Sequence, residues 1–279
     1  KENIFRVVFY RDYTYSDFVG YTCPALQLNK ETNNVKYSFI PGPFTLALEH
    51  ALLSEEKVFL IIEEMNRGNC ASIYGDLFQL LDRDKNGVSQ YPISNSMIRN
   101  YLNKNTKISS TLNSMGIGEN NIILPANLYI IGTMNTADQN VFSMDSAFKR
   151  RFKMVYVPID FNKTDKLIRI DELSKVNIFN NKSTWSDFAK HVNKLIDKLN
   201  SDMVSISEDK KLGPYFVEEV DVSSRQTFCD KVIYYLKNDV FKYTPNVLPL
   251  PYNYLYERIV VEEQDIMTLL EYGGNEHEI

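Results

Sequence analysis

The sequence predicts an α/β protein, in which a parallel sheet lies between layers of helices and a mainly helical region follows. Three observations predict this class: the short apolar runs are continuous rather than alternating, helical patterns lie between them, and strand-like runs stop near residue 160. Because 44% of the 279 residues are hydrophobic, the chain can bury a core, and wholesale disorder is excluded.

Four short runs, mostly of β-branched or aromatic residues with polar residues on either side, are typical of buried strands. They are Ile4–Phe9, Val58–Ile62, Leu128–Gly132 and Met154–Val157. Continuous hydrophobicity favours strands that are covered on both faces, as in a parallel sheet between helices. The repeated strand–helix order therefore indicates a three-layer core.

Helical patterns separate these strands and dominate the rest of the chain. Thr45–Leu53 and Ala71–Asp82 carry apolar residues at helical spacing, and the polar stretch Arg83–Ile123 is interpreted as an insertion or hairpin. Further helices are expected at Trp185–Asn200, Ser223–Lys237 and Glu262–Glu271. We therefore expect a sheet domain over residues 1–160 and a mainly helical domain over residues 161–279.

Charge and cysteine content exclude several classes of protein. The net charge is −5, from 31 basic and 36 acidic residues, which argues against a chain that coats nucleic acid without sequence preference. Cys23, Cys70 and Cys229 have no CxxC spacing, so neither a zinc site nor a disulfide framework is predicted. No apolar run approaches the roughly 20 residues of a membrane span, and no signal peptide is recognised. We expect a cytoplasmic protein that does not enter a membrane.

The segment KVFLIIEEMNRGN (57–69) is an apolar strand that ends in two adjacent carboxylates, Glu63 and Glu64. Ligands of parallel α/β sheets bind at the carboxyl ends of the strands. Nucleotide hydrolysis needs one acid for Mg²⁺ and a second for the attacking water. The segment has the pattern of a Walker B motif, with Glu63 for the metal and Glu64 for the water; solvated acids at a strand end are the alternative.

The segment NLYIIGTMNTAD (127–138) is a second apolar strand that ends in polar residues, here Thr133, Asn135 and Asp138. A neutral amide beside the first strand can hydrogen-bond the attacking water or a phosphate without repelling either, which is the sensor 1 role. The alternative is an Asn that caps a tight turn.

The segment SMDSAFKRRF (143–152) places Arg150 and Arg151 after a short helical pattern. Guanidinium groups bind phosphate well because their planar fork donates in pairs and stays charged. A solvated basic turn is the alternative, since the end of a helix favours cations.

The order of EEMNRGN, GTMNTAD and DSAFKRRF resembles the McrB family of AAA+ proteins, of which MNTAD is a distinctive sequence. FRVVFYRDYTYSDFVGY, YPISNSMIRNYL and KLGPYF are also similar to stretches of that family, so the resemblance covers nearly the whole chain. It implies an AAA+ P-loop NTPase core followed by a helical lid. The first metal acid is Glu rather than the more common Asp, and Gln139 and Asn140 stand where the family often has Arg.

The resemblance also implies roles and partners. The protein would be a ring-forming GTPase, with a hexamer expected and ATP as the alternative nucleotide, that uses Mg²⁺ and drives an McrC-like endonuclease subunit. Methylated DNA would be bound by domains outside this chain. The matching residues are Glu63 for the metal, Glu64, Asn135 and Asp138 for catalysis, Arg150 and Arg151 for a neighbouring subunit's nucleotide, and Asn66, Arg67 and Lys211 for nucleotide contacts.

No phosphate-binding loop of the form G-x-x-x-x-G-K-[ST] occurs in the sequence; Gly116 and Gly118 are not followed by the required Lys. We expect the first strand and this loop to lie upstream of Lys1, and the 279-residue chain to hydrolyse little nucleotide by itself. Two alternatives stay open. One is a non-hydrolysing AAA+-like assembly or adaptor module; the other is an AAA+ ATPase that remodels protein complexes, like MoxR or dynein.

Overall fold

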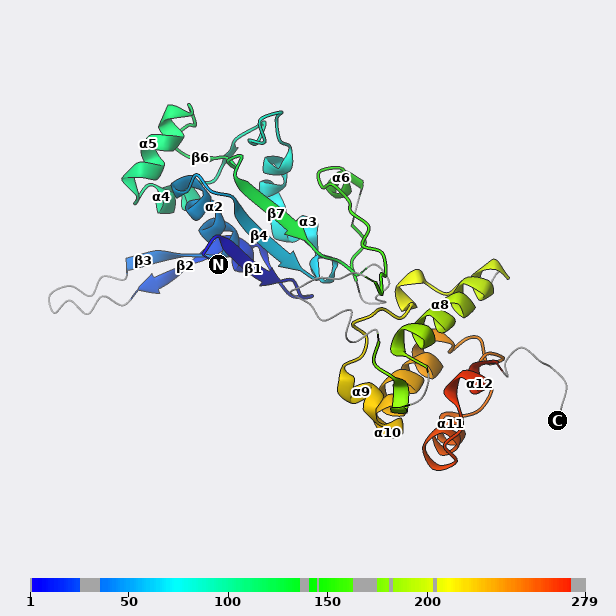
Figure 1. Cartoon of the computed structure of the whole chain (residues 1–279). Coiled ribbons are helices and arrows are strands. Elements are labelled where there is room, and N and C mark those ends of the chain that lie inside the picture. The colour runs from blue at the N-terminus through cyan, green and yellow to red at the C-terminus, as the bar shows by residue number, and fades with distance from the viewer. Residues whose placement is uncertain are drawn as a thin grey trace. The chain divides into compact units, whose positions relative to one another are not determined.

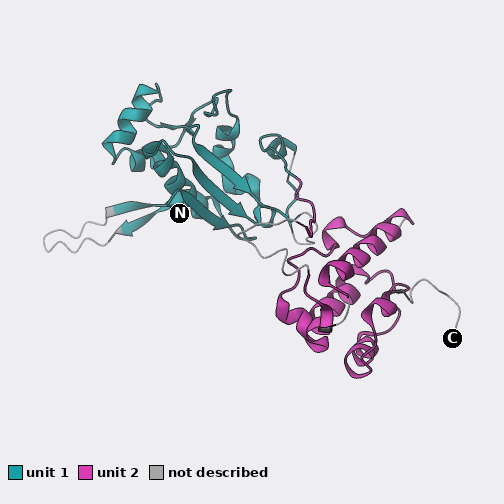
Figure 2. Ribbon diagram, in the orientation of Figure 1, with its two compact units in different colours: residues 1–155 teal, residues 156–279 magenta. Residues whose placement is uncertain are grey.

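The computed structural model describes residues 2–25, 36–135, 141–144, 146–162, 175–180, 183–202 and 205–271. The chain divides into two compact units, Lys1–Val155 and Tyr156–Ile279 (Figure 2). The first contains the sheet and the second is built from helices. The boundary between the units follows Val155, five residues before the boundary expected from the sequence, which followed residue 160.

A three-stranded parallel sheet forms the centre of the first unit (Figure 1). Its strands are β1 (Ile4–Val8), β4 (Val58–Glu63) and β7 (Leu128–Gly132), in the order β1-β4-β7. These are three of the four predicted strands, and both pairings are parallel as predicted. Each strand is formed by a continuous apolar run, and parallel pairing brings the carboxyl ends of all three to one edge.

The two faces of the sheet differ. Val58, Leu60 and Ile62 of β4 are fully buried, and helix α2 (Pro43–Leu53) packs on the sheet through its own buried residues. Every second residue points to the other face, which carries Ile4, Val8, Tyr129 and Ile131, each exposed by 42–51%.

The fourth predicted strand is wrong. Residues 154–157 form no strand and pair with no other segment in the described part of the chain, and their side chains are exposed by 52–78%. A strand needs a neighbour for its backbone N–H and C=O groups. Residues 154–157 have no such neighbour in the described part of the chain, where the sheet ends at β7.

A short helix and a β-ribbon between β1 and α2 were not predicted. Helix α1 (Tyr15–Val19) begins with a capping box in which Thr14 and Asp17 exchange side-chain and backbone hydrogen bonds. Strands β2 (Gly20–Ala25) and β3 (Lys36–Pro41) then pair antiparallel.

The helix predicted over residues 71–82 forms in two pieces. Helix α3 (Cys70–Tyr74) is followed by a 3₁₀ helix, η2 (Gly75–Leu81), because Gly75 adopts a φ of 50° that interrupts the α-helix. The predicted apolar positions Ile73 and Leu77 are buried, as expected of the core-facing side.

The polar stretch 83–123 contains more structure than predicted. It forms helices α4 (Ser96–Leu102) and α5 (Thr106–Ser114) as well as the short pair β5 (Ile93–Ser94) and β6 (Asn121–Ile122). Asn95 caps α4 and Asn105 caps α5, each with its side-chain oxygen. Two polar residues of this stretch therefore serve as helix caps.

The second unit is assembled around helix α8 (Trp185–Ser201), whose Trp185, Phe188, Val192 and Ile196 lie on one buried face. Shorter helices complete it: η3 (Ile178–Asn180), η4 (Glu208–Lys210), α9 (Glu219–Ser223), α10 (Arg225–Phe228), η5 (Cys229–Ile233), η6 (Leu236–Val240), α11 (Tyr252–Tyr256), η7 (Glu257–Val261) and α12 (Ile266–Glu271). No helix in the described ranges has the length and apolar character needed to span a membrane.

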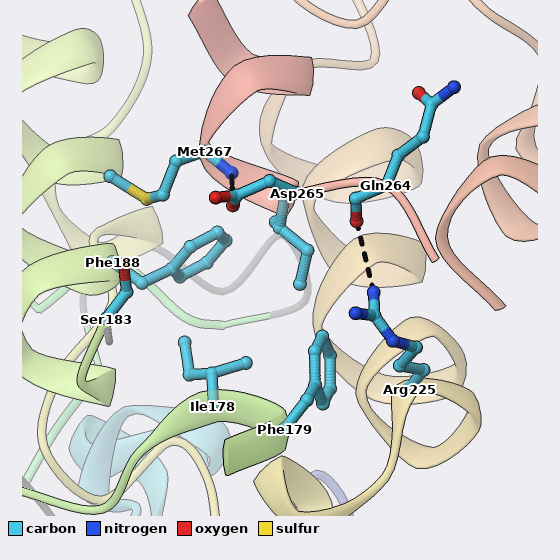
Figure 3. A pocket seen from close by; sticks show the side chains of 9 residues that line it. Ile178, Phe179, Ser183, Phe188, Arg225, Gln264, Asp265 and Met267 are labelled. Atoms are coloured by element: carbon cyan, nitrogen blue, oxygen red, sulfur yellow. Dashed lines mark hydrogen bonds between the residues drawn. The ribbon is translucent and has the colours of Figure 1, made fainter. Parts of the chain in front are cut away.

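A small cavity lies inside the second unit (Figure 3). Arg225 borders it, stacks 4.9 Å from the Phe179 ring and donates a 3.1 Å hydrogen bond to the Gln264 carbonyl oxygen. Its volume of about 10 Å³ is at most enough for one water molecule. The cavity is therefore a packing feature and not a nucleotide site.

Candidate functional site at the ends of β4 and β7

The two predicted strand-end motifs meet at one edge of the sheet. Ile62 of β4 pairs with Gly132 of β7, and the pairing continues beyond both strands. Thr133 donates its backbone N–H to the Ile62 carbonyl oxygen at 2.9 Å and accepts the N–H of Met65 at 2.8 Å, while its hydroxyl accepts the Glu64 N–H at 3.4 Å. The acids after β4 and the polar segment after β7 are thus hydrogen-bonded neighbours.

The backbone turns sharply at Glu64. Its φ of 52° and ψ of 42° are left-handed, a conformation that costs a non-glycine residue roughly 1–2 kcal/mol. The 3₁₀ helix η1 (Met65–Arg67) starts directly after it. Strain of this kind is concentrated at functional sites, where the surrounding structure holds it in place.

Each of the two acids contacts an arginine. Arg6 of β1 donates from Nε to Glu63 Oε1 at 2.7 Å, and its Nη2 forms an ion pair with the same oxygen. Arg67 donates from Nε to Glu64 Oε2 at 2.9 Å. The Glu63 and Glu64 side chains are 30% and 39% exposed, so both are open to solvent and to a ligand.

Asn66 connects three segments of the site. It is only 3% exposed; its Nδ2 donates to the Asn135 carbonyl oxygen at 2.5 Å, and its own carbonyl accepts the Phe142 N–H at 2.7 Å. Its Oδ1 is buried and has no hydrogen-bond partner among the described residues. A predicted nucleotide contact thus lies beneath the surface, against the Asn135 segment. Asp138, the other predicted residue of that segment, lies outside the described residues.

Arg150 and Arg151, which follow helix α6 (Ser146–Lys149), have different environments. The Arg151 side chain is 9% exposed: it forms a 2.6 Å ion pair with Asp82, donates to the Ala147 carbonyl oxygen at 3.0 Å and lies 4.0 Å from the Phe78 ring centre. Arg150 is exposed, and its side chain makes no hydrogen bond or ion pair in the described part of the chain.

Both arginines line a groove of about 770 Å³ that runs along β7 and also contains Lys85, Lys153 and Tyr129. Most of its charged side chains are cationic, so an anion is the kind of ligand that its electrostatics favour.

Lys211, the predicted phosphate contact, belongs to the second unit. Its Nζ lies 2.6 Å from Asp197 Oδ1 and 3.7 Å from Glu208 Oε1, and the side chain is 17% exposed. The hydrogen bond that Lys211 donates to Asp197 raises the pKa of Lys211 above its ordinary value. Lys211 is thus already held by two carboxylates of its own unit.

The carboxylates suit a magnesium ion that arrives with a nucleotide. No group of three or more His, Cys, Asp or Glu side chains within the described ranges could hold a metal ion. Mg²⁺ keeps several waters and is usually bound by one or two carboxylates together with substrate phosphates. Glu63 and Glu64 are adjacent and partly exposed, so they fit a Mg²⁺ ion that is bound together with a nucleotide. Two carboxylates are too few to bind the ion without the nucleotide's phosphates.

Sequence reasoning missed two residues of the site. Thr133 was noted only as a polar residue at the strand end, whereas it makes three of the hydrogen bonds that join the motifs. Arg6 was not singled out, although it is the one charge inside the apolar run IFRVV. A single charged residue in an apolar run is a signal that could have identified Arg6. The strand register is needed as well, because it shows which acid Arg6 contacts.

The chain is similar to a family of AAA domains and to two proteins of restriction systems. A family described as "AAA domain (dynein-related subfamily)" matches residues 1–152. A component of the type II restriction enzyme BsuMI of Bacillus subtilis, YdiS, is 38% identical over 263 residues, covering 87% of this chain and 71% of the relative. The EcoKMcrB subunit of a type IV methyl-directed restriction enzyme of Escherichia coli is 29% identical over 158 residues, or 56% of this chain. The match spans 28% of that subunit's length.

Proposed function

Because the chain belongs to the dynein-related subfamily of AAA domains and is an McrB-like AAA+ protein, we propose that it is the GTP-hydrolysing motor module of a modification-dependent DNA restriction complex. AAA+ NTPase chemistry in a restriction-system family follows from the relatives; GTP as the nucleotide is our proposal. The observation that supports it most is the junction of Glu63 and Glu64 with the segment Thr133–Asn135.

The proposed roles follow from where each group lies. Bound Mg²⁺ would neutralise the charge of the nucleotide's terminal phosphates. Glu63 would hold a water of the metal's shell, and Glu64, on the adjacent left-handed turn, would accept the proton of the attacking water. Asn135 would orient that water, together with Asp138. Arg67 holds one oxygen of Glu64, which leaves Oε1 for the water.

Further nucleotide contacts are proposed for Asn66, indirectly through the Asn135 backbone, and for Lys211 of the helical lid. A Lys211 contact requires the lysine to exchange part of its pairing with Asp197 and Glu208 for phosphate. The 279 residues contain no G-x-x-x-x-G-K-[ST] sequence, so this chain should hydrolyse little nucleotide by itself.

Arg150 and Arg151 are proposed to act together on the nucleotide of a neighbouring subunit in a hexameric ring. Arg150, exposed and without a partner in the described chain, would reach the phosphates, while Arg151 is held by Asp82 and Phe78 and would set the position of the turn. An arginine supplied to another subunit's nucleotide stabilises transition-state charge without binding the ground state in its own subunit.

The proposed partners are an McrC-like endonuclease and methylated DNA, the latter bound by domains outside this chain. The printed name of the E. coli relative, a subunit of a methyl-directed restriction enzyme, supports this choice. We propose a cytoplasmic location because the DNA substrate is there.

The deciding experiment is Glu64→Gln in the complete protein, with GTP and ATP hydrolysis measured in parallel. We expect hydrolysis to fall by about 10²–10⁴-fold, because a general base is lost, while nucleotide binding is retained. Glu55→Gln, the same change at an exposed position before β4, is the control and should leave the rate unchanged. Unchanged turnover in Glu64→Gln would remove Glu64 from the mechanism, and a preference for ATP would exclude the GTPase assignment.

Two other functions are favoured by single observations. The dynein-related family match is compatible with an ATPase that remodels protein complexes. The absence of a G-x-x-x-x-G-K-[ST] sequence from the 279 residues is compatible with a non-hydrolysing adaptor that supplies Arg150 to a partner. A complete protein that binds no nucleotide but accelerates hydrolysis by a partner subunit would identify the adaptor.

A further inference from the structure

Arg6 lies where it can reach the first acid of the site from a neighbouring strand. It occupies β1, which pairs with β4 in a register that places Arg6 beside Ile61. Glu63 is two residues further along β4 and so projects from the same face of the sheet. The contact joins residues 57 positions apart, so it exists only because β1 and β4 are neighbours.

Arg6 binds only one of the two carboxylate oxygens of Glu63. Nε and Nη2 of Arg6 both bind Oε1, whereas Oε2 has no hydrogen-bond partner in the described part of the chain. Two donors on one oxygen restrict the rotation of the carboxylate about its terminal bond. The second oxygen is thereby held in a constant direction at the carboxyl end of β4.

Stability does not explain this pair. The Arg6 side chain is 68% exposed and that of Glu63 30%, and ion pairs in such surroundings contribute little to the free energy of unfolding. The Arg67–Glu64 contact, by comparison, spans three residues within one turn and follows from local geometry. Arg6 is on another strand and makes a contact that local sequence does not impose.

We propose that Arg6 is a positioning residue for Glu63: it holds Oε1 so that Oε2 is directed at the water shell of a nucleotide-bound Mg²⁺. This inference rests on the proposed function, since it assumes that Glu63 serves the metal. Partners that orient a metal-binding carboxylate typically change metal affinity by about 10–100-fold when they are removed. The expected effect is therefore on metal affinity first and on turnover second.

The test measures Mn²⁺ binding in place of Mg²⁺, by electron paramagnetic resonance, in the complete protein carrying Glu64→Gln and saturated with GTP. We expect Arg6→Ala to weaken Mn²⁺ binding by about 10-fold, and Arg6→Lys, which keeps the charge but not the two-nitrogen fork, to weaken it less. Arg11→Ala is the matched control, because Arg11 follows the same strand, is exposed and makes no side-chain hydrogen bond or ion pair in the described chain. The Mn²⁺ affinity of this variant should not change.

Two results would overturn the proposal. Unchanged Mn²⁺ affinity in Arg6→Ala would show an ordinary surface ion pair, and tighter binding would show that Arg6 competes with the metal. Thermal unfolding of each variant separates these results from a folding defect, and if Arg6→Ala does not fold, Arg6→Lys decides by the same criterion. Glu63→Gln in the same background tests the metal role itself: if it does not weaken Mn²⁺ binding, the proposed function has failed at Glu63, whatever Arg6 does.

Discussion

Charged side chains of the two units differ in whether they are paired or left exposed. In the helical unit, two lysines are paired with carboxylates of the same unit: Lys211 with Asp197, and Lys231 with Asp221 at 2.5 Å. In the sheet unit, Arg150 is left exposed without a partner in the described chain, and Glu64 keeps one oxygen beyond its contact with Arg67. Paired charges within a unit support its structure, whereas exposed charges at strand and helix ends are available to a ligand.

Two aromatic side chains, one in each unit, also differ in exposure. Trp185 in the helical unit is fully buried and stacks near Phe188 and Phe216, with ring centroids 5.9 and 6.2 Å away. Tyr129 in the sheet unit is 42% exposed beside Phe59. The comparison therefore predicts that substitutions in the sheet unit's strand and helix ends change activity, while substitutions in the helical unit change stability.

The largest effect is expected for Arg150→Ala. In rings that mix this variant with wild-type subunits, hydrolysis at sites next to a variant subunit should fall by about 10³-fold, because an arginine supplied in trans contributes 10³–10⁵ to turnover. Thermal stability should not change, since the exposed Arg150 side chain makes no hydrogen bond or ion pair in the described chain. Arg151→Ala should lower the unfolding temperature instead, because it leaves Asp82 unpaired. Equal hydrolysis rates in mixed and wild-type rings would contradict the proposal that Arg150 acts on the nucleotide of a neighbouring subunit.

Trp185→Ala should have the largest effect on stability. Removing a fully buried indole leaves a cavity and deprives the Gly213 carbonyl of a 3.2 Å hydrogen bond, so the free energy of unfolding should fall by about 3–5 kcal/mol. Urea unfolding followed by circular dichroism measures it. Tyr129→Ala is the counterpart in the sheet unit, and its half-exposed ring should contribute clearly less. A similar loss in both variants would contradict the difference between the units.

The smallest effect is expected at the start of α8. Thr184 and Asp187 form a capping box, so Asp187→Ala should cost about 1 kcal/mol of unfolding free energy. Hydrogen bonds from the Thr184 side chain and backbone lower the pKa of Asp187 below its ordinary value of 3.8. A carboxyl group whose pKa is lower in the folded state stabilises that state at pH values above its unfolded-state pKa. This stabilisation is lost as the pH falls through the folded-state pKa. The difference in unfolding free energy between wild type and Asp187→Ala should therefore become smaller below pH 3.8, as measured by unfolding at a series of acidic pH values. A difference that does not change with pH would contradict a stabilising role of the ionised Asp187 carboxylate.

Much of the sheet could be predicted because its signals are local. The runs that form β1, β4 and β7 are apolar and end in polar residues, and no long-range information is needed to recognise them. Residues 154–157 have the same composition and form no strand, because a strand also requires a neighbour. The β2–β3 ribbon was missed for the converse reason, since its stability comes from pairing and not from an apolar run.

The sequence alone determined which side chains stand at the ends of strands: Glu63 and Glu64 after one, Asn135 after another, and two adjacent arginines after a helix. Only the tertiary structure decided which of them meet. The Arg6–Glu63 contact joins residues 57 positions apart and the Arg151–Asp82 contact residues 69 apart, distances at which residue periodicity carries no information. Strand register placed Arg6 beside an acid, and packing of α6 against Phe78 buried one arginine while leaving the other exposed.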